Sequence, residues 1–267
     1  MSRRLFKYLA AGACAMLLGL VLGRGTARAQ SVDELVSKGT INVGVLIDLP
    51  PFGFLNDKQE PDGYDVEVAK LLGTYMGVKV NLVPVVTSTR VPFLTTGKVD
   101  LIIGTLGITP ERAKTVMFSI PYSAIENTVY GAKGKKISEI ADLKGLRVGV
   151  PRGGVQDVIL TRALGNTAKM ARFDDTPSCY QAMLTGQIDA MAETALTFDG
   201  VMKANPGADI EKKFVLLRQP NGITMRANQF NLLQWVNTFV YYVKNNGELD
   251  ALHQKWLKSP LPNLPVF

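Results

Sequence analysis

An alternation of short apolar strands with amphipathic helices is the feature that most constrains this fold. Residues 41–47 and 99–104 are typical of strands that are apolar on both faces. Residues 66–76, between them, place apolar side chains at three- and four-residue spacing, which is typical of a helix. Strands that are apolar on both faces lie between two layers of helices. The pattern predicts the α/β class, with a mixed, mostly parallel sheet flanked by helices.

The same pattern starts again in the second half of the chain. Residues 142–150 lead into a strand, and residues 169–173 and 188–192 are further predicted strands. Two successive strand-helix runs predict two similar lobes, although no sequence repeat marks a duplication. The predicted helices of this half are residues 155–164, 177–184 and 196–204.

The first 29 residues have the composition of a secretory signal peptide. Three basic residues within the first seven positions precede an apolar run over residues 9–22, and the segment closes with Ala27-Arg28-Ala29. A basic start, a short apolar middle and an A-x-A end are the parts of such a signal. The apolar run is shorter than the roughly 20 residues that cross a bilayer. We therefore expect residues 1–29 to be an export signal and the mature chain to be periplasmic.

Much of the excess positive charge lies in this first segment. It holds five of the 30 basic residues and none of the 23 acidic residues, so the net charge falls from +7 to +2 without it. Nucleic-acid binding relies on concentrated positive charge facing phosphates. The nearly balanced mature chain therefore gives no support for a nucleic-acid partner.

Cysteine and histidine are scarce in this chain. Cys179 is the only cysteine after residue 29, and His253 is the only histidine. One cysteine forms no internal disulfide, and a zinc site needs several such ligands. A Ser-His-Asp or Cys-His centre is not indicated either. We expect no metal, no cofactor and no catalytic residue.

A glycine turn opens the helix at residues 66–76. The stretch from Gly63 to Leu72 combines this turn with Tyr64 and with two acids, Asp65 and Glu67, which suit the positive end of a helix. Further motifs stand in a fixed order around it. They are Pro51-Phe52, residues 97–103, residues 105–112, Phe118-Ser-Ile-Pro-Tyr122, residues 142–145, residues 186–190, residues 246–250 and Lys255-Trp256.

In type and order, these motifs resemble those of the family-3 extracellular solute-binding proteins, the polar amino-acid receptors of bacterial ABC importers. The resemblance covers essentially the whole chain after the signal. It implies a two-lobed periplasmic binding protein type II fold, with two hinge strands and a ligand in the cleft between the lobes. The implied first lobe is discontinuous, residues 30–130 plus 221–267, and the implied second lobe is residues 131–220.

The stretch from Thr105 to Arg112 carries the strongest site prediction. In the family that the motifs resemble, the arginine that ends it binds the α-carboxylate of the ligand. A guanidinium suits this role because its planar fork donates to both carboxylate oxygens. Thr105 and Gly107 follow a predicted strand, and the resemblance implies that they offer backbone groups to the ligand. Gly107 also has no Cβ to keep a ligand away.

Three further residues are candidate ligand contacts. Phe52 stands where relatives place aromatic side chains against the ligand, although it can equally belong to the core. Arg90 starts a short predicted helix over residues 90–96 and is either a cleft residue or a surface arginine. Gly154 precedes the helix at residues 155–164, whose free N–H groups suit a carboxylate. Relatives have a hydroxyl residue in this turn, so backbone donors would have to suffice here.

The largest departure from the family pattern follows residues 188–192. Typical receptors have an aspartate there that pairs with the α-ammonium of the ligand, and this chain has Thr194 in that position, with Glu193 beside it. Either Glu193 takes over the role or the ligand lacks a free α-ammonium. A buried ammonium without a partner costs several kcal/mol, so this difference decides the class of ligand.

The sequence thus predicts a monomeric, non-catalytic receptor that captures an amino acid or related carboxylate for an ABC permease in the inner membrane. Two other functions stay open. One is a periplasmic enzyme similar to cyclohexadienyl dehydratase, in which Glu193 would be a general acid. The other is a ligand-sensing domain that works with a separate membrane receptor.

Overall fold

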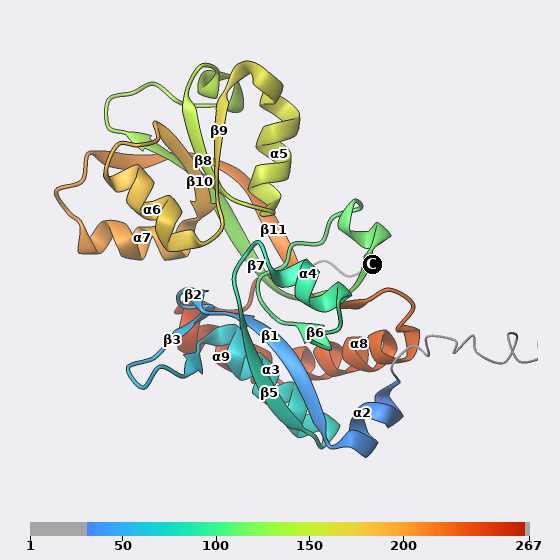
Figure 1. Cartoon of the computed structure of the whole chain (residues 1–267). Coiled ribbons are helices and arrows are strands. Elements are labelled where there is room, and N and C mark those ends of the chain that lie inside the picture. The colour runs from blue at the N-terminus through green and yellow to red at the C-terminus, as the bar shows by residue number, and fades with distance from the viewer. Residues whose placement is uncertain (1–30, 265–267) are drawn as a thin grey trace, which may run out of the picture. The chain divides into compact units, whose positions relative to one another are not determined.

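The computed structural model describes residues 31–264 (Figure 1). The predicted export signal, residues 1–29, therefore lies outside the described residues. The helices are α2 (Val32–Lys38), α3 (Tyr64–Met76), α4 (Arg90–Thr95), α5 (Val155–Leu164), α6 (Thr176–Leu184), α7 (Ala195–Ala204), α8 (Phe230–Asn245) and α9 (Glu248–Leu257). The strands are β1 (Thr40–Leu46), β2 (Asp48–Leu49), β3 (Gly53–Leu55), β4 (Pro61–Asp62), β5 (Lys79–Val85), β6 (Leu101–Ile102), β7 (Val116–Ala132), β8 (Arg147–Pro151), β9 (Lys169–Phe173), β10 (Ala190–Thr194) and β11 (Ile210–Arg226).

Eight of these strands form one mixed sheet in the order β5-β1-β6-β11-β7-β10-β8-β9. Both ends of the sheet are parallel: β1 pairs with β5 and β6, and β8 pairs with β9 and β10. Between them, the 17-residue strands β7 and β11 run antiparallel to each other and continue through both halves. The predicted α/β class with a mixed sheet is confirmed, and β7 and β11 occupy the place of the two expected hinge strands.

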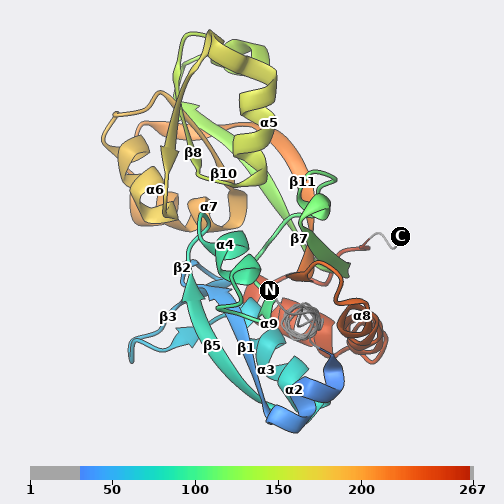
Figure 2. The same ribbon diagram turned by 45° about the vertical axis from the view of Figure 1, so that its right-hand side comes forward.

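The buried apolar side chains form separate cores toward the two ends of β7 and β11. One group of cores draws on residues 35–125 and 223–257, and we call this part the first lobe. The other group draws on residues 129–216, which we call the second lobe. In Figures 1 and 2 the blue N-terminal and red C-terminal segments pack together in the first lobe. The exact boundaries given by the sequence stay a prediction.

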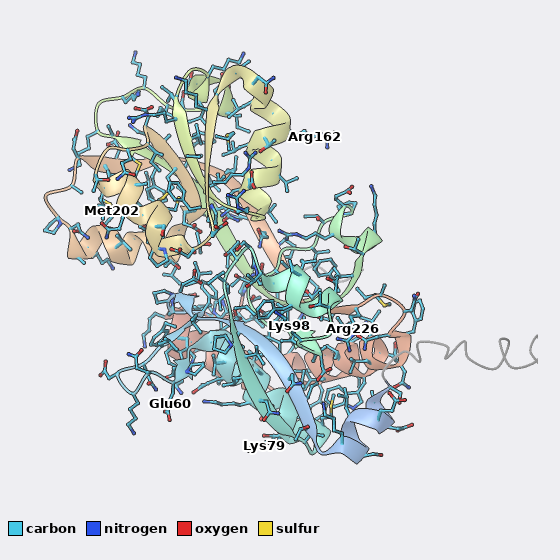
Figure 3. All side chains as sticks on the ribbon, viewed as in Figure 1. Glu60, Lys79, Lys98, Arg162, Met202 and Arg226 are labelled. Atoms are coloured by element: carbon cyan, nitrogen blue, oxygen red, sulfur yellow. The ribbon has the colours of Figure 1, made fainter. Side chains whose placement is uncertain are left out.

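The surface of both lobes is charged. Exposed residues such as Lys79 in the first lobe and Arg162 in the second lie at the outside of the ribbon, as Figure 3 shows. Within residues 31–264 there is no helix with the length and apolar character needed to cross a membrane. The same residues contain no cluster of three or more His, Cys, Asp or Glu side chains suited to a metal ion.

The glycine turn before α3 has a geometry that only glycine accepts easily. Gly63 has a φ of 122°, and a Cβ there would lie 2.6 Å from the carbonyl oxygen of Phe52. The turn buries Asp65 completely, where it accepts a hydrogen bond of 2.8 Å from the Tyr122 hydroxyl. That hydroxyl in turn accepts the backbone N–H of Thr105 at 3.3 Å. The motif thereby holds the loop after β6 in place.

Candidate ligand-binding site

A narrow cavity lies where the two lobes and the hinge strands meet. Its walls come from loops at the ends of several strands, which is where open α/β sheets bind their ligands. The lining residues are Leu49, Thr87, Arg90, Thr105 and Arg112 from the first lobe, Ile125, Asn127 and Gln219 from the hinge strands, and Pro151, Gly154, Val155, Gln156, Glu193 and Thr194 from the second lobe.

Six of the eight predicted contact residues line this cavity. Gly107 is not among the lining residues, but its carbonyl oxygen accepts a hydrogen bond of 2.7 Å from Arg112. A Cβ at Gly107 would lie 2.4 Å from the side chain of Gln219, so the glycine allows a hinge residue to approach. The six residues that line the cavity are Arg90, Thr105, Arg112, Gly154, Glu193 and Thr194.

Phe52 lies in the core of the first lobe and does not line this cavity. Its side chain is 2% exposed and packs edge-to-face on Tyr64, with 6.4 Å between the ring centroids. Leu49, three residues earlier, lines the cavity instead. The structure shows Phe52 packed in the core of the first lobe, and a contact between Phe52 and a ligand stays a prediction.

Arg112 reaches from the first lobe to the second. It begins the 3-10 turn η1 (Arg112–Lys114) that leads into β7, and it is half-buried. Its Nη1 donates to the carbonyl oxygen of Gly107 and its Nη2 to the carbonyl oxygen of Gly153, both at 2.7 Å. Burial, with the charge of Arg90 as a second cause, lowers the pKa of Arg112 to about 9. The guanidinium is therefore charged at neutral pH.

Arg90 is the more deeply buried of the two arginines, with 4% of its side chain exposed. It opens α4, and its Nη1 donates to the carbonyl oxygen of Gly104 at 2.8 Å. Burial lowers the pKa of Arg90 to about 10, and the nearby carboxylates of Asp48 and Glu193 oppose that shift. Arg90 too is charged at neutral pH, and hydrogen bonds to backbone carbonyl oxygens hold its side chain in place.

Neither guanidinium has a carboxylate within 4 Å among residues 31–264. Burying a charge is costly unless it is paired, and carbonyl oxygens offset only part of that cost. An anionic group in the cavity would supply the missing partner. The wall of the first lobe therefore has the chemistry of an anion-binding site.

Glu193 and Thr194 end β10 on the wall of the second lobe. The Oε1 atom of Glu193 accepts the backbone N–H of Thr194 at 2.7 Å. Its Oε2 atom is buried and has no hydrogen-bond partner within the described part of the chain. Burial is the main cause that raises the pKa of Glu193 to about 7. This side chain can therefore be protonated or ionised at neutral pH, and a cation beside it would favour the ionised form.

The start of α5 provides backbone donors to the same cavity. Gly154 is the N-cap residue, and its own N–H already donates to the carbonyl oxygen of Pro151 at 3.1 Å. The N–H groups of Val155 and Gln156 have no acceptor among residues 31–264. Free N–H groups at a helix N-terminus, together with the helix dipole, attract carboxylates. The expectation that backbone donors replace a hydroxyl in this turn is compatible with this geometry.

The hinge strands contribute a buried hydrogen-bond chain that the sequence did not reveal. Asn127 of β7 donates through Nδ2 to the Oε1 atom of Gln219 on β11 at 3.2 Å. Gln219 donates through Nε2 to the carbonyl oxygen of Thr105 at 3.1 Å and to Oδ1 of Asn221 at 2.7 Å. Thr105 has a φ of 47°, which is unusual for a residue other than glycine, and this bond helps to hold it there. This hydrogen-bond chain joins the first lobe to both hinge strands.

Sequence reasoning missed Asn127 and Gln219 because it assigned ligand contacts only to strand ends and helix starts. Asn127 carried some signal, since most side chains of β7 are buried, but Gln219 carried little, because β11 also holds exposed charged residues such as Glu211 and Lys212. A polar residue at such a position needs a partner. Thr87 and Gln156 carried no comparable signal, because polar residues are ordinary in loops and at helix starts.

A two-lobed α/β fold with a cavity between its lobes, lined by two charged arginines, is typical of a solute-binding protein of the type II class. The model of the family "Bacterial extracellular solute-binding proteins, family 3" matches residues 41–259. The chain belongs to this family. The resemblance that the sequence motifs carry is thereby confirmed.

Individual relatives show how close the similarity is. The L-cystine-binding protein TcyJ of Escherichia coli (strain K12) is 30% identical over 84% of this chain and 85% of its own length. The ABC transporter glutamine-binding protein GlnH of Bacillus subtilis (strain 168) is 29% identical over 81% and 80%. The crystal structure of the ancestral amino acid-binding protein AncCDT-1, a precursor of cyclohexadienyl dehydratase, superposes with a TM-score of 0.75 at 30% identity, and covers 84% of this chain and 98% of that one.

Proposed function

We propose that this protein is the periplasmic receptor of an ABC importer and that it captures an amino acid or a closely related carboxylate. The observation that carries the proposal is the pair of donors on facing walls of one cavity, the Arg112 guanidinium and the start of α5. Both suit a carboxylate, and one ligand between them would join the two lobes. The names of the relatives and the family description support the same function.

The carboxylate would bind to Arg112 in place of a contact that this residue now makes across the cleft. Its Nη2 donates to the carbonyl oxygen of Gly153, which belongs to the loop just before α5. A carboxylate at this point accepts from the guanidinium and from the free N–H groups of Val155 and Gln156. Each such charge-assisted hydrogen bond contributes roughly 1.5–3 kcal/mol when it is shielded from water.

Closure around the ligand follows from contacts that need both lobes. Two such hydrogen bonds remain when the ligand takes the place of Gly153 at Arg112: the Thr176 N–H donates to Oδ2 of Asp48 at 3.1 Å, and the Ser88 hydroxyl donates to the carbonyl oxygen of Asp174 at 3.2 Å. A ligand that contacts both walls adds to these bonds only in the closed form, so it shifts the population toward closure. An ABC permease can then distinguish the loaded receptor from the empty one. We propose that the protein does this as a monomer, without cofactor and without catalysis.

Calorimetry on the mature chain, residues 30–267, tests this function. The panel contains the standard L-amino acids and the corresponding carboxylates that lack the amine. We expect at least one amino acid to bind with micromolar or tighter affinity, which corresponds to about −8 kcal/mol and is within reach of a bidentate pair with several shielded hydrogen bonds. Absence of binding across both panels would contradict the proposal.

A periplasmic dehydratase is the second candidate, and one observation favours it. The pKa of Glu193 is raised to about 7, which suits a general acid, and Arg112 in the same cavity could hold a substrate carboxylate. Incubating the protein with prephenate or arogenate and measuring aromatic product separates the two functions. Turnover that disappears in Glu193→Gln would favour the enzyme. A stable complex with an amino acid and no product would favour the receptor.

A further inference from the structure

The outward side of α8 is built differently from the rest of the surface. Charged residues make up 20% of the chain and lie at the outside of both lobes, whereas Lys244 is the only charged residue of the 16 in α8, and it is half-buried. The outward side holds aromatic and uncharged polar residues, which we call the α8 face: Phe230, Asn231, Gln234, Trp235, Thr238, Tyr241, Tyr242 and Asn245.

The aromatic rings of the α8 face are strongly exposed. Phe230, Tyr241 and Tyr242 are 67%, 64% and 54% exposed. Trp235 is half-buried and stacks on the ring of Phe239, with 5.9 Å between the ring centroids and 4° between the planes. Rings that gather on one side of a helix, with no charge among them, mark a surface that contacts another surface.

The chemistry of this face suits the interface between water and lipid. Tyrosine and tryptophan gather at that interface in membrane proteins, because each combines an apolar ring with one polar group. The other residues of the face are Asn, Gln and Thr side chains, which can exchange hydrogen bonds with lipid headgroups. They do so without the cost of removing a charge from water.

The start of the described chain lies beside the same helix. The N–H of Val32 in α2 donates to Oδ1 of Asn231 at 3.1 Å, and Figures 1 and 2 show α2 next to α8. The apolar run of the predicted export signal ends at Leu22, and only residues 23–30 separate it from Ser31. Fully extended, this connection spans at most about 30 Å. A signal held in a bilayer therefore keeps the α8 face within reach of the lipid surface.

We propose that the α8 face docks on the lipid surface of the membrane while the export signal is attached, and that the mature chain, which lacks this anchor, leaves it. The anchor turns docking into an intramolecular step, in which a short linker gives an effective concentration in the millimolar range. Without the anchor, a few aromatic side chains bind lipid only weakly. The inference goes beyond solute capture and rests on the predicted export signal. None of the residues of α8 is among those that line the interlobe cavity.

The two tryptophans of the chain allow a direct test. Trp235 belongs to the α8 face, whereas Trp256 of α9 packs on Phe54 at 5.9 Å and has a buried Nε1. Trp256→Phe leaves Trp235 as the only indole, and Trp235→Phe leaves Trp256. The full chain is inserted into phosphatidylcholine vesicles whose acyl chains carry bromine close to the headgroups. Bromine should quench Trp235 about 2-fold and leave Trp256 nearly unchanged, because only the first ring enters the interface.

Variants of the face sharpen this test. The double variant Phe230→Gln with Tyr241→Gln removes two exposed rings and keeps the face uncharged. It should abolish most of the quenching of Trp235, although the signal still anchors the chain. Val215→Thr, at a 49% exposed position of β11 in the second lobe, is the control and should leave the quenching unchanged. The mature chain with Trp235 as its only indole should show little quenching at the same lipid concentration.

Each other outcome would overturn the proposal. Trp235 without quenching in the full chain would show that the face does not reach lipid, and equal quenching of both tryptophans would show contact that does not depend on α8. Equal quenching of the full and mature chains would exclude release. A mature protein with twice its expected mass in light scattering, restored to a single chain by the double variant, would assign the face to a second copy. Calorimetry tests solute capture separately, so either proposal can fail without the other.

Discussion

The two walls of the cavity differ in how firmly their charge is fixed. The wall of the first lobe holds Arg90 and Arg112, whose pKa values of about 10 and about 9 keep them positive across the neutral range. The wall of the second lobe holds Glu193, whose pKa of about 7 lets it change charge in that range. We therefore expect the two walls to respond differently to pH. In the neutral range, binding of the carboxylate to the first wall should not depend on pH, whereas binding of the amine to the second wall should.

The largest expected effect comes from removing the fixed charge of the first wall. Arg112→Ala should weaken binding of the amino acid about 100-fold, because a bidentate charge-assisted pair is lost from a shielded site. Arg112→Lys keeps the charge and loses the planar fork, so its affinity should lie between those of the wild type and Arg112→Ala. Calorimetry measures both affinities.

Arg152→Ala is the control for that experiment. Arg152 is an arginine of the second lobe, close to the cavity loop, and it pairs with Asp174 at 2.6 Å on the surface. It is not among the residues that line the cavity. Its loss should change the affinity by less than about 2-fold, as for most exposed ion pairs. If Arg112→Ala bound the amino acid as tightly as the wild type does, the first wall would have no role in binding the carboxylate.

The next largest effect tests the titrating second wall. An ammonium favours the ionised form of Glu193, and the ligand-free pKa of about 7 means that this form must be gained on binding at low pH. Affinity should therefore rise as the pH increases toward about 7 and level off above it, with protons released on binding over the rising part of the curve. Glu193→Gln should bind about 10-fold more weakly above that pH and lose this slope.

Two other acids make this assignment testable. Asp65 also has a pKa raised to about 7 by burial, but it faces Tyr122, Tyr64 and Arg90 in the first lobe and is not among the lining residues. Glu126 lies on β7 and is likewise not a lining residue. Glu126→Gln should keep the slope of the wild-type protein. A slope that survived in Glu193→Gln would move the titration to another buried acid, Asp48 or Asp65, and would end the proposed contrast between the walls.

Much of the fold could be predicted from the sequence because its signals are local. Apolar strands such as residues 41–47 and the periodic helix at residues 66–76 need no distant partner to be recognised, and Gly63 marks its turn by a backbone geometry that excludes other residues. The site was harder to predict. Arg112 could be named only because its motif resembles that of a family, since an isolated arginine at a turn says nothing about a cleft.

Non-local contacts account for most of what the sequence could not show. Asn127 and Gln219 meet across 92 positions of the chain, so their pairing has no local signature. Phe52 has the same apolar character whether it packs on a ligand or in the core. Thr105 adopts a left-handed backbone that its own side chain disfavours. It is held there by the bond that its N–H donates to Tyr122 and by the bond that its carbonyl oxygen accepts from Gln219.

The smallest expected effect concerns Asp48, a carboxylate of the first lobe that accepts a hydrogen bond from the second lobe. Asp48 of β2 accepts the N–H of Thr176 at the start of α6 through Oδ2 at 3.1 Å, so it caps a helix of the opposite lobe. Asp48→Ala removes this cap only in the closed form. A helix cap contributes about 1 kcal/mol, so binding should weaken about 5-fold. Small-angle scattering should show a larger radius of gyration for the ligand-free variant.

A second acid at the same helix provides a matched control for Asp48. Asp175 caps α6 from within the second lobe, where it accepts the N–H of Ser178 at 2.8 Å. Asp175→Ala should lower the unfolding temperature and leave the affinity unchanged, because its contact exists in open and closed forms alike. Asp48→Asn keeps an acceptor for the Thr176 N–H, so it should weaken binding less than Asp48→Ala does. If Asp48→Ala and Asp175→Ala behaved the same way, the cap from Asp48 would stabilise the helix and not closure.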